Sequence, residues 1–132
     1  MASPTPNTPN PSTAKVAYLC TDLLFTSKIR ESARGLGLET VAARDPAGLL
    51  ASAGGASVVI VDLRRPDALE ALDQLGRLGA TATGPRVPRV IGFCDHERVE
   101  LLEEARRRGC LALPKGKFSS ELKHLLLPGD RG

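Results

Sequence analysis

The sequence predicts one α/β domain built on a five-stranded parallel sheet. Short apolar runs alternate five times with segments of helical periodicity, which favours parallel strands with helices on both faces of the sheet. Residues 58–61 are all β-branched, as is typical of a parallel strand buried on both faces. Asp62 ends this run, and Pro66 begins the following loop. Because open α/β folds place their sites at the carboxyl edge of the sheet, we expect Asp62 to lie at a functional edge.

Each strand is followed by a helical stripe, and the expected strands are residues 16–20, 38–43, 57–62, 89–94 and 110–113. The first helix places apolar residues at positions 25, 29, 33 and 36 and ends near two glycines. The second is short, with Asp45 as N-cap and Pro46 in its first turn. The third carries leucines at 69, 72, 75 and 78, the fourth covers 99–105, and the fifth covers 118–126. These elements predict a flavodoxin-like (βα)5 three-layer sandwich with strand order 2-1-3-4-5.

The domain is expected to cover residues 15–127. Residues 1–14 hold four prolines and no charge, so they cannot bury enough surface to become ordered, and we expect a disordered tail. A short tail at 128–132 follows the last helix, and the glycine- and proline-rich residues 79–88 form a surface connection. We therefore expect a stand-alone domain with no effector domain after it.

Composition excludes several function classes. The net charge of +3 comes from scattered residues; the runs Arg64-Arg65 and 106–108 are too short for a nucleic-acid tail, and only four aromatic residues are available for stacking. Three cysteines without a CxxC pair favour reduced thiols. No stretch reaches the roughly 18 apolar residues of a membrane span, and no secretory signal is present. We expect a cytoplasmic protein that binds neither nucleic acid nor membrane.

The predicted topology brings a set of polar residues to one edge of the sheet. In the order 2-1-3-4-5, the ends of strands 1, 3 and 4 converge at the topological switch point. The first strand supplies Cys20, Thr21 and Asp22, the third Asp62, the fourth Cys94, Asp95 and His96, and the loop after the fifth Lys115 and Lys117.

The five βα units, the strand-ending Asp62 with Pro66, and a lysine after strand 5 before Phe118 resemble the receiver domains of bacterial two-component response regulators. The resemblance covers about residues 15–127. It implies that Asp62 stands where such domains accept a phosphoryl group, beside Mg²⁺ held by two acids after strand 1, a Thr or Ser ending strand 4, and a lysine before a proline. A carboxylate that attacks a phosphoryl group needs a hard cation with oxygen ligands and a lysine to hold the phosphate.

The chain departs from that pattern at nearly every partner of Asp62. The two acid positions fall on Cys20 and Thr21, so only Asp22 is nearby, and Cys94 lacks the hydroxyl of a Thr or Ser. Residues 114–118 (Pro-Lys-Gly-Lys-Phe) replace the lysine-proline pair. These departures predict a pseudo-receiver, which retains the acceptor aspartate but lacks the residues that would bind Mg²⁺ and the phosphoryl group.

Structural interpretations compete at each position. Asp22 and Asp95 each precede a predicted helix and are expected to act as N-caps. Asp62 is a cap, a relic held by Lys115 or Lys117, or a live phosphate acceptor. Cysteines 20 and 94 with Asp95 and His96 match no zinc spacing, and Cys94 with His96 is a weak nucleophile–base pair, so we expect core cysteines and an exposed histidine.

Two function classes follow. The first is a non-catalytic signalling or protein-interaction module, without a cofactor and not an enzyme. The alternative is a single-domain response regulator phosphorylated on Asp62, with Mg²⁺ at Asp22 and Asp62. A ligand-binding flavodoxin-like protein is disfavoured because the turn at 21–24 lacks residues that would cradle a phosphate.

The partner surface is expected on the fourth helix, fifth strand and fifth helix, the face through which the resembled family passes its signals. The expected interface residues are basic: Arg98, Arg106, Arg107, Lys117, Lys123 and His124. This surface favours an acidic protein partner, and we expect a monomer or weak homodimer.

Overall fold

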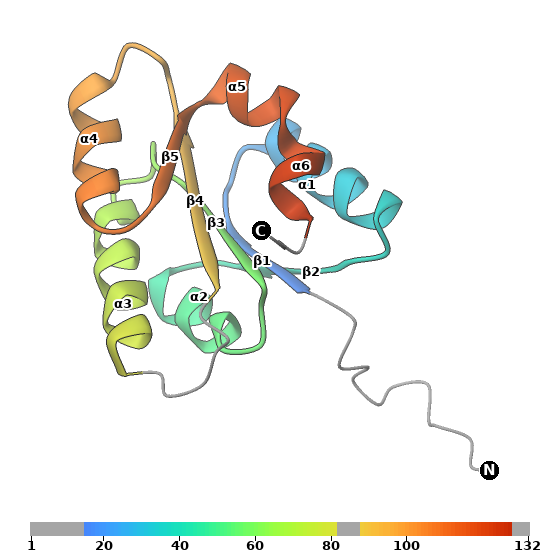
Figure 1. Ribbon diagram of the computed structural model, residues 1–132, viewed down its shortest axis with the longest axis horizontal. Coiled ribbons are helices and arrows are strands. Elements are labelled where there is room, and N and C mark those ends of the chain that lie inside the picture. Colours follow the sequence, from blue (N-terminus) through green and yellow to red (C-terminus); the bar gives the residue numbers. More distant parts are fainter. Residues whose placement is uncertain (1–14, 82–87, 128–132) are drawn as a thin grey trace.

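The fold is a five-stranded parallel sheet covered on both faces by helices. A computed structural model describes residues 15–81 and 88–127 of the chain. The strands are β1 (Lys15–Leu19), β2 (Glu39–Ala43), β3 (Val58–Asp62), β4 (Arg89–Cys94) and β5 (Leu111–Pro114). All strand pairs are parallel and the order is β2-β1-β3-β4-β5, as predicted. The carboxyl ends of β1, β3 and β4 therefore lie side by side in the sheet (Figure 1).

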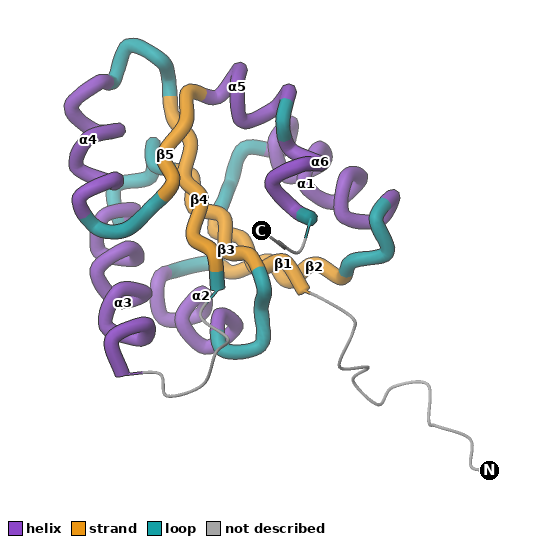
Figure 2. The backbone as a smooth tube through the Cα atoms, in the orientation of Figure 1, coloured by secondary structure: helices purple, strands orange, loops and turns teal. Residues whose placement is uncertain are grey.

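The helices form two layers, one on each face of the sheet (Figures 1 and 2). One layer contains α2 (Pro46–Ala53), α3 (Ala68–Thr81) and α4 (Val99–Arg107), whose buried residues share a core cluster with Leu19 and Val61. The other contains α1 (Leu23–Gly35), α5 (Lys115–Ser120) and α6 (Leu122–Leu126), whose buried residues pack with Ile60 and Phe93. Adjacent strand residues thus face opposite cores, which explains why β3 is apolar along its whole length.

Most element boundaries agree with the sequence-based expectations to within about two residues, but two expectations are wrong. The surface connection expected at 79–88 begins too early, because α3 continues to Thr81. The single helix expected over 118–126 is wrong, because the backbone leaves the helical region at Glu121 (φ −107°, ψ 12°) and divides the segment into α5 and α6. Phe118 and Leu126 are both fully buried on either side of this bend. The bend is thus accompanied by burial of apolar side chains from both short helices.

Glycine at position 92 of β4 allows a close approach that positions the loop after β3. A Cβ atom at Gly92 would lie 2.8 Å from Sγ of Cys110 and 2.9 Å from the side chain of Leu63. Leu63 is 2% exposed and its backbone N–H donates to the Phe93 carbonyl at 2.9 Å. The loop that follows Asp62 is therefore anchored by backbone and packing to the neighbouring strand.

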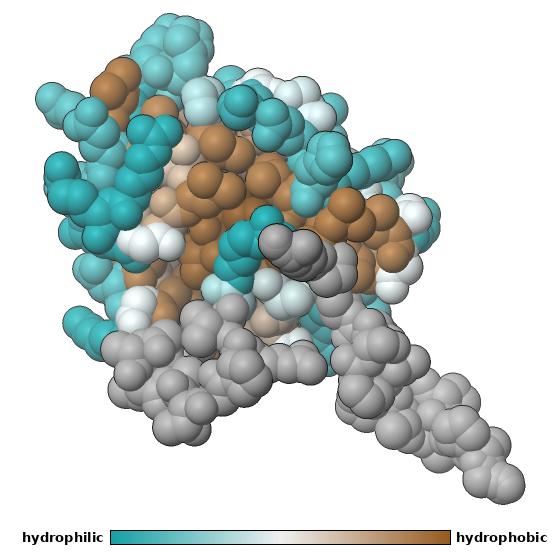
Figure 3. Space-filling model, in the orientation of Figure 1, coloured by the Kyte–Doolittle hydropathy of each residue, from teal (hydrophilic) through white to brown (hydrophobic). Residues whose placement is uncertain are grey.

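Three sequence-based expectations concern residues outside the described ones. The tails at 1–14 and 128–132, and residues 82–87 of the predicted surface connection, are not described. Within the described ranges, no helix has the length and apolar character needed to cross a membrane. Figure 3 shows polar surface over the outer sides of the helices and apolar surface gathered toward the sheet between the two layers.

Candidate functional site

Asp62 is the one buried charged or polar side chain among the described residues, and it lies where β3 ends. Its exposed fraction is 3%. The Arg65 N–H donates to the Asp62 carbonyl at 3.1 Å, and the Arg64 N–H donates to Oδ1 of Asp62 at 3.0 Å. An aspartate that accepts from the backbone two residues ahead closes a tight local turn. This turn brings the Arg64 side chain back over the Asp62 carboxylate.

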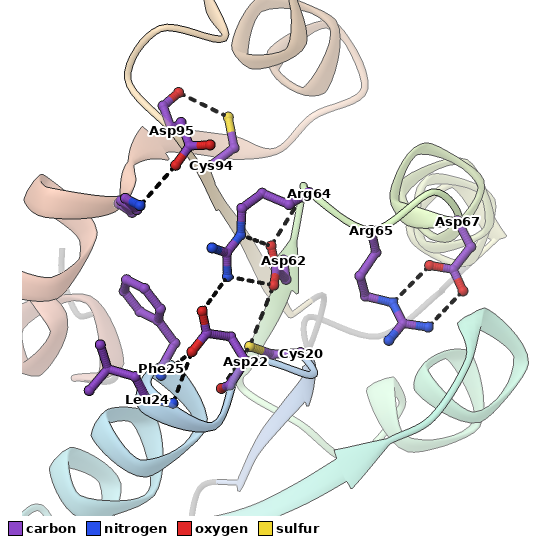
Figure 4. Close-up of polar contacts among 11 residues, drawn as sticks. Cys20, Asp22, Leu24, Phe25, Asp62, Arg64, Arg65, Asp67, Cys94 and Asp95 are labelled. Carbon is purple, nitrogen blue, oxygen red and sulfur yellow. Dashed lines mark hydrogen bonds and ion pairs between the residues drawn. The ribbon is translucent and has the colours of Figure 1, made fainter.

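The Arg64 guanidinium joins the two carboxylates of the pocket (Figure 4). Its Nε and Nη2 atoms donate to the two oxygens of Asp62 at 2.8 and 2.9 Å. Nη2 also donates to Oδ2 of Asp22 at 3.0 Å. The hydrogen bonds that Arg64 donates to Asp62, and also to Asp22, raise the pKa of Arg64, and the bond that Asp22 accepts from Arg64 lowers the pKa of Asp22. The pocket therefore contains a permanent cation that belongs to the chain.

Aromatic rings surround this guanidinium. The Arg64 Cζ atom lies 5.5 Å from the ring centroids of both Phe25 and Phe93. Phe93 in turn stacks on Phe118 of α5, with centroids 4.4 Å apart. Both arginine and lysine can make cation–π contacts, but lysine does not reproduce the planar, two-point pairing of arginine with a carboxylate. The side chain of Arg64 is thus held by two kinds of contact at once.

Asp22 supports the start of α1 as well as Arg64. Its Oδ1 atom accepts from the N–H groups of Leu24 at 2.9 Å and Phe25 at 3.3 Å. The prediction that Asp22 is an N-cap is confirmed, as is the N-cap at Asp45, which accepts from Gly48 N–H at 2.8 Å. The other oxygen of Asp22 faces Arg64, so this carboxylate links the helix to the pocket.

Both cysteines of the predicted pocket are buried thiols. The Cys20 Sγ atom lies 3.7 Å from two weak acceptors, the Asp22 carbonyl and Oδ2 of Asp62, and the Cys94 Sγ–H donates to the Asp95 carbonyl at 3.5 Å. Burial raises the pKa of each thiol, so neither is activated as a nucleophile. His96 is exposed, which confirms the expectation of core cysteines with an exposed histidine.

Thr21 is exposed at the mouth of the site. It helps to line a hollow of about 420 Å³ together with Asp22, Asp62, Arg64, Arg65 and Pro66. Cys20, at the other position where the resemblance implies an acid, is buried, and its Sγ atom lies 3.7 Å from both the Asp22 carbonyl and Oδ2 of Asp62. Neither residue offers a carboxylate to this hollow.

The two lysines after β5 do not reach Asp62. Lys115 pairs with Asp95 (Nζ–Oδ1 2.9 Å) and Lys117 pairs with Glu121 (Nζ–Oε2 3.4 Å). The hypothesis that either lysine holds Asp62 is therefore wrong, because Arg64, two residues away along the chain, occupies both of its oxygens. Asp95 is not an N-cap either: α4 begins four residues later, at Val99, with Arg98 in the N-cap position. The bond from Lys115 lowers the pKa of Asp95.

Sequence reasoning missed Arg64 and Arg65, which it treated only as a short basic run. Arg65 pairs with Asp67 at 2.8 and 2.9 Å and donates to the Arg44 carbonyl at 3.1 Å, tying the β3–α3 loop to the end of β2. The available signal was the spacing of Asp62 and Arg64 in a loop that leaves a buried strand. A basic residue two positions after such an aspartate can fold back onto it.

The donor set does not fit a divalent cation. Mg²⁺ prefers oxygen ligands in an octahedral arrangement, usually including more than one carboxylate. No group of three or more His, Cys, Asp or Glu side chains in the described ranges could hold a metal ion. The two carboxylates that face the pocket, Asp22 and Asp62, are bridged by Arg64.

The residues expected at the partner interface are all exposed, but their settings differ. Arg106 donates to the Ala112 carbonyl at 2.9 Å, and Arg107 pairs with Glu104 at 2.6 Å. Lys117 is paired with Glu121, as described above. Lys123 and His124 lie on α6, on the opposite layer from Arg98 and Arg106 at α4.

Comparison with known proteins supports the fold and only the fold. No family model and no curated protein matches the sequence. Among solved structures, the receiver domain of the Pseudomonas aeruginosa sensor histidine kinase PA1611, with a magnesium ion in its active-site cleft, is 20% identical (TM-score 0.68, 87% of this chain and 95% of that one). The Vibrio cholerae chemotaxis response regulator CheY4 is 17% identical (TM-score 0.64, 87% and 100%).

A third similar structure contains a partner protein. The receiver domain of Saccharomyces cerevisiae Ssk1, crystallised with the histidine phosphotransfer protein Ypd1, is 14% identical (TM-score 0.67, 86% of this chain and 89% of that one). The chain therefore has the fold of response-regulator receiver domains, as the sequence predicted.

Proposed function

We propose that this chain is a non-catalytic signalling module of the cytoplasm that binds a protein partner without accepting phosphate on Asp62. The observation that carries this proposal is the Arg64 guanidinium, which pairs with both oxygens of Asp62 and with Asp22. A positive charge is thereby supplied to the acidic pocket by the chain itself.

Phosphate acceptance requires an available carboxylate oxygen and a hard cation that offsets the charge of the phosphoryl group. The similar P. aeruginosa domain holds magnesium in its active-site cleft. Here both oxygens of Asp62 accept from Arg64, and Oδ2 also faces the Cys20 thiol. An attack by Asp62 would have to break a buried two-point ion pair before any bond to phosphorus formed.

The β4–β5 side of the pocket also lacks groups for a phosphoryl oxygen. Cys94 is buried and bonded to a carbonyl, and Lys115 is paired with Asp95. Arg64 joins β3 to the start of α1, Arg65 joins it to β2, and Lys115 joins α5 to the loop after β4. These cross-connections favour a static module over a phosphorylation-driven switch.

Protein binding is the activity that remains for such a module. Ssk1, which shares the fold, was crystallised with a protein partner. For this chain we propose an acidic protein partner, with the exposed residues Arg98, Arg106, Lys117 and Lys123 as the interface expected from the sequence.

A phosphodonor assay tests the proposal. The chain is incubated with acetyl phosphate and excess Mg²⁺, and its intact mass is followed. We expect no added phosphate, and an Asp62→Asn variant serves as the baseline. Stoichiometric addition that disappears in Asp62→Asn would establish the alternative, a phosphate-accepting response regulator.

A further inference from the structure

The two edges of the sheet differ in how they are protected. β5 lies at one edge and β2 at the other (Figure 1). At the β5 edge, the Arg106 side chain donates to the Ala112 carbonyl at 2.9 Å, and Pro114 has no N–H to donate to a further strand. Prolines and charged side chains are features by which edge strands avoid pairing with other chains. The β5 edge is therefore protected against a further strand.

The β2 edge lacks such protection in the part of the chain that the structure describes. The side-chain hydrogen bonds nearest to β2 in sequence lie beyond its last residue. Arg65 donates to the Arg44 carbonyl at 3.1 Å. Asp45 accepts from the Gly48 N–H at 2.8 Å. Helices α1 and α2 contact β2 from opposite layers, so they cover its two faces. One row of β2 backbone groups is thus left without a strand partner among the described residues.

The side chains of β2 are also suited to a neighbouring strand. Among the strands of the described ranges, β2 alone has no buried residue, whereas each of the others has at least two. Thr40 and Val41 are partly buried and Ala42 is exposed. Threonine and valine are typical of strands and pack well against the residues of an adjacent strand. A further strand at this edge would cover uncharged side chains that are now open to water.

The two ends of β2 carry opposite charges. Glu39 begins the strand and Arg44 directly follows its last residue, and both residues are exposed. Neither forms an ion pair with another residue in the described ranges. Because the acid is at the start and the base at the end, the strand is complementary in charge to a second copy that runs in the opposite direction. A second copy is therefore the partner that this edge fits best.

We propose that two copies of this chain pair through β2 in antiparallel orientation, so that their sheets become continuous. A two-fold axis perpendicular to the sheet at Val41 places Val41 opposite Val41 of the second copy, and Thr40 opposite Ala42. In this register, Glu39 of each copy lies opposite the last residue of β2 in the other copy, next to Arg44. This inference concerns assembly, so it goes beyond the proposed function.

The helix beside this edge carries no charge that would oppose the pairing. α2 contacts both β1 and β2, and a two-fold axis perpendicular to the sheet keeps the α2 helices of both copies on the same face. α2 is the one helix in the described ranges without a charged residue, and no charged residue occurs at positions 46–61. Association through β2 therefore removes no charge of α2 from water, which would be costly.

Other arrangements fit these observations less well. Pairing through β5 would meet the Arg106 side chain at the Ala112 carbonyl and the missing N–H of Pro114. An extended segment of an unrelated protein needs only the backbone of β2, and it has no reason to match the charges at both ends. The opposite charges of Glu39 and Arg44 thus distinguish a second copy from other strands.

Sedimentation equilibrium of the full chain over a range of protein concentrations measures the association. We expect a reversible monomer–dimer equilibrium, and a weak one because the paired strands are only five residues long. Val41→Lys places two ammonium groups opposite each other at the axis and should weaken the dimer at least about tenfold. The matched control is Leu111→Lys, which puts lysine in place of an exposed apolar residue of the β5 edge and should leave the affinity within about twofold.

An exchange of charge between two variants tests the register. Glu39→Arg gives two basic strand ends and Arg44→Glu gives two acidic ones, so each variant alone should dimerise at least about fivefold more weakly than the parent. In an equimolar mixture, every end of one variant meets an end of opposite charge in the other. The mixture should therefore associate about as tightly as the parent, which also shows that both variants are folded.

The proposal is overturned if the parent stays monomeric, if Leu111→Lys weakens association as much as Val41→Lys, or if the mixture associates no better than the single variants. Should Val41→Lys disturb the fold, seen as a loss of dispersion in its amide spectrum, the charge variants decide alone. Phosphate on Asp62 and binding of an acidic partner are separate readouts, so failure of the β2 dimer leaves the proposed function standing.

Discussion

Each side of the pocket contains one ion pair, Asp62 with Arg64 on the β3 side and Asp95 with Lys115 on the β4–β5 side, and the two pairs differ in how far they are buried. Asp62 and Arg64 pair with side chains that are 4% and 25% exposed, whereas Asp95 and Lys115 pair with side chains that are 38% and 46% exposed. The first pair is two-pointed and covered by aromatic rings, and the second is a single contact in solvent. Breaking a buried pair leaves a charge without compensation, whereas exposed pairs contribute little. The Asp62–Arg64 pair should therefore contribute more to the stability of the fold than the Asp95–Lys115 pair.

The largest effect is expected from Arg64→Leu. This substitution leaves the buried Asp62 carboxylate without its cation and should lower the free energy of unfolding by about 3 kcal/mol. Thermal unfolding should show a fall in Tm on the order of 10 °C. A loss no greater than that of an exposed arginine, such as Arg30→Leu, would show that the pair does not hold the pocket together.

A smaller loss is expected from Asp62→Asn. The amide keeps an oxygen for the Arg64 N–H but loses the charge-assisted contacts to the guanidinium, so we expect a cost of roughly 1 to 3 kcal/mol. Chemical denaturation measures the difference, and a variant as stable as the parent would show that the charge of Asp62 is not needed for its pairing with Arg64.

Acid should affect both sides of the pocket over the same pH range. Arg64 lowers the pKa of Asp22, and Lys115 lowers the pKa of Asp95, in each case from the ordinary value of 3.8. A carboxyl whose folded pKa is depressed contributes stability that is complete above its unfolded pKa and is lost as the pH falls through the folded pKa. Stability should therefore be level from pH 7 to about 5 and decline below about 4.

The corresponding test is a series of Tm values against pH for the parent and for Asp22→Asn. The decline below the ordinary carboxyl pKa should be shallower in the variant. Curves that stay parallel down to the acid limit would show that Asp22 does not contribute to the pH dependence.

The smallest effect is expected from Lys115→Ala. The pair with Asp95 is exposed and single-pointed, so we expect Tm to change by no more than about 2 °C. The comparison between the two sides of the pocket would fail if this variant lost as much stability as Arg64→Leu.

The sequence predicted the architecture because its strand signals, its helix caps and the order of its elements all agreed. The β-branched run before Asp62, the caps at Asp22 and Asp45, and the alternation of strands and helices all indicate one topology, and that topology places the strand ends together. The gathering of Asp22, Asp62 and Cys20 at one edge follows from strand order alone.

Partner choice within the pocket was not predictable in the same way. One interpretation of the sequence had Lys115 or Lys117 reach Asp62 from the segment after β5, but a local turn brings Arg64 onto it instead. Which cation pairs with Asp62 depends on the turn that follows it and on the side-chain conformation of Arg64. Helical or strand periodicity carries no information about either. The same applies to Asp95, whose distance from the start of α4 is set by the loop.

A magnesium titration tests most directly whether Arg64 takes the place of a metal ion. Mg²⁺ is added up to about 10 mM to the ¹⁵N-labelled chain while the amide signals of Asp22, Asp62 and Arg64 are followed, because a hard cation would need the two carboxylates that Arg64 bridges. We expect only small, non-saturating shifts in the parent. Saturable binding at sub-millimolar Mg²⁺, with changes centred on Asp22 and Asp62, would contradict the account.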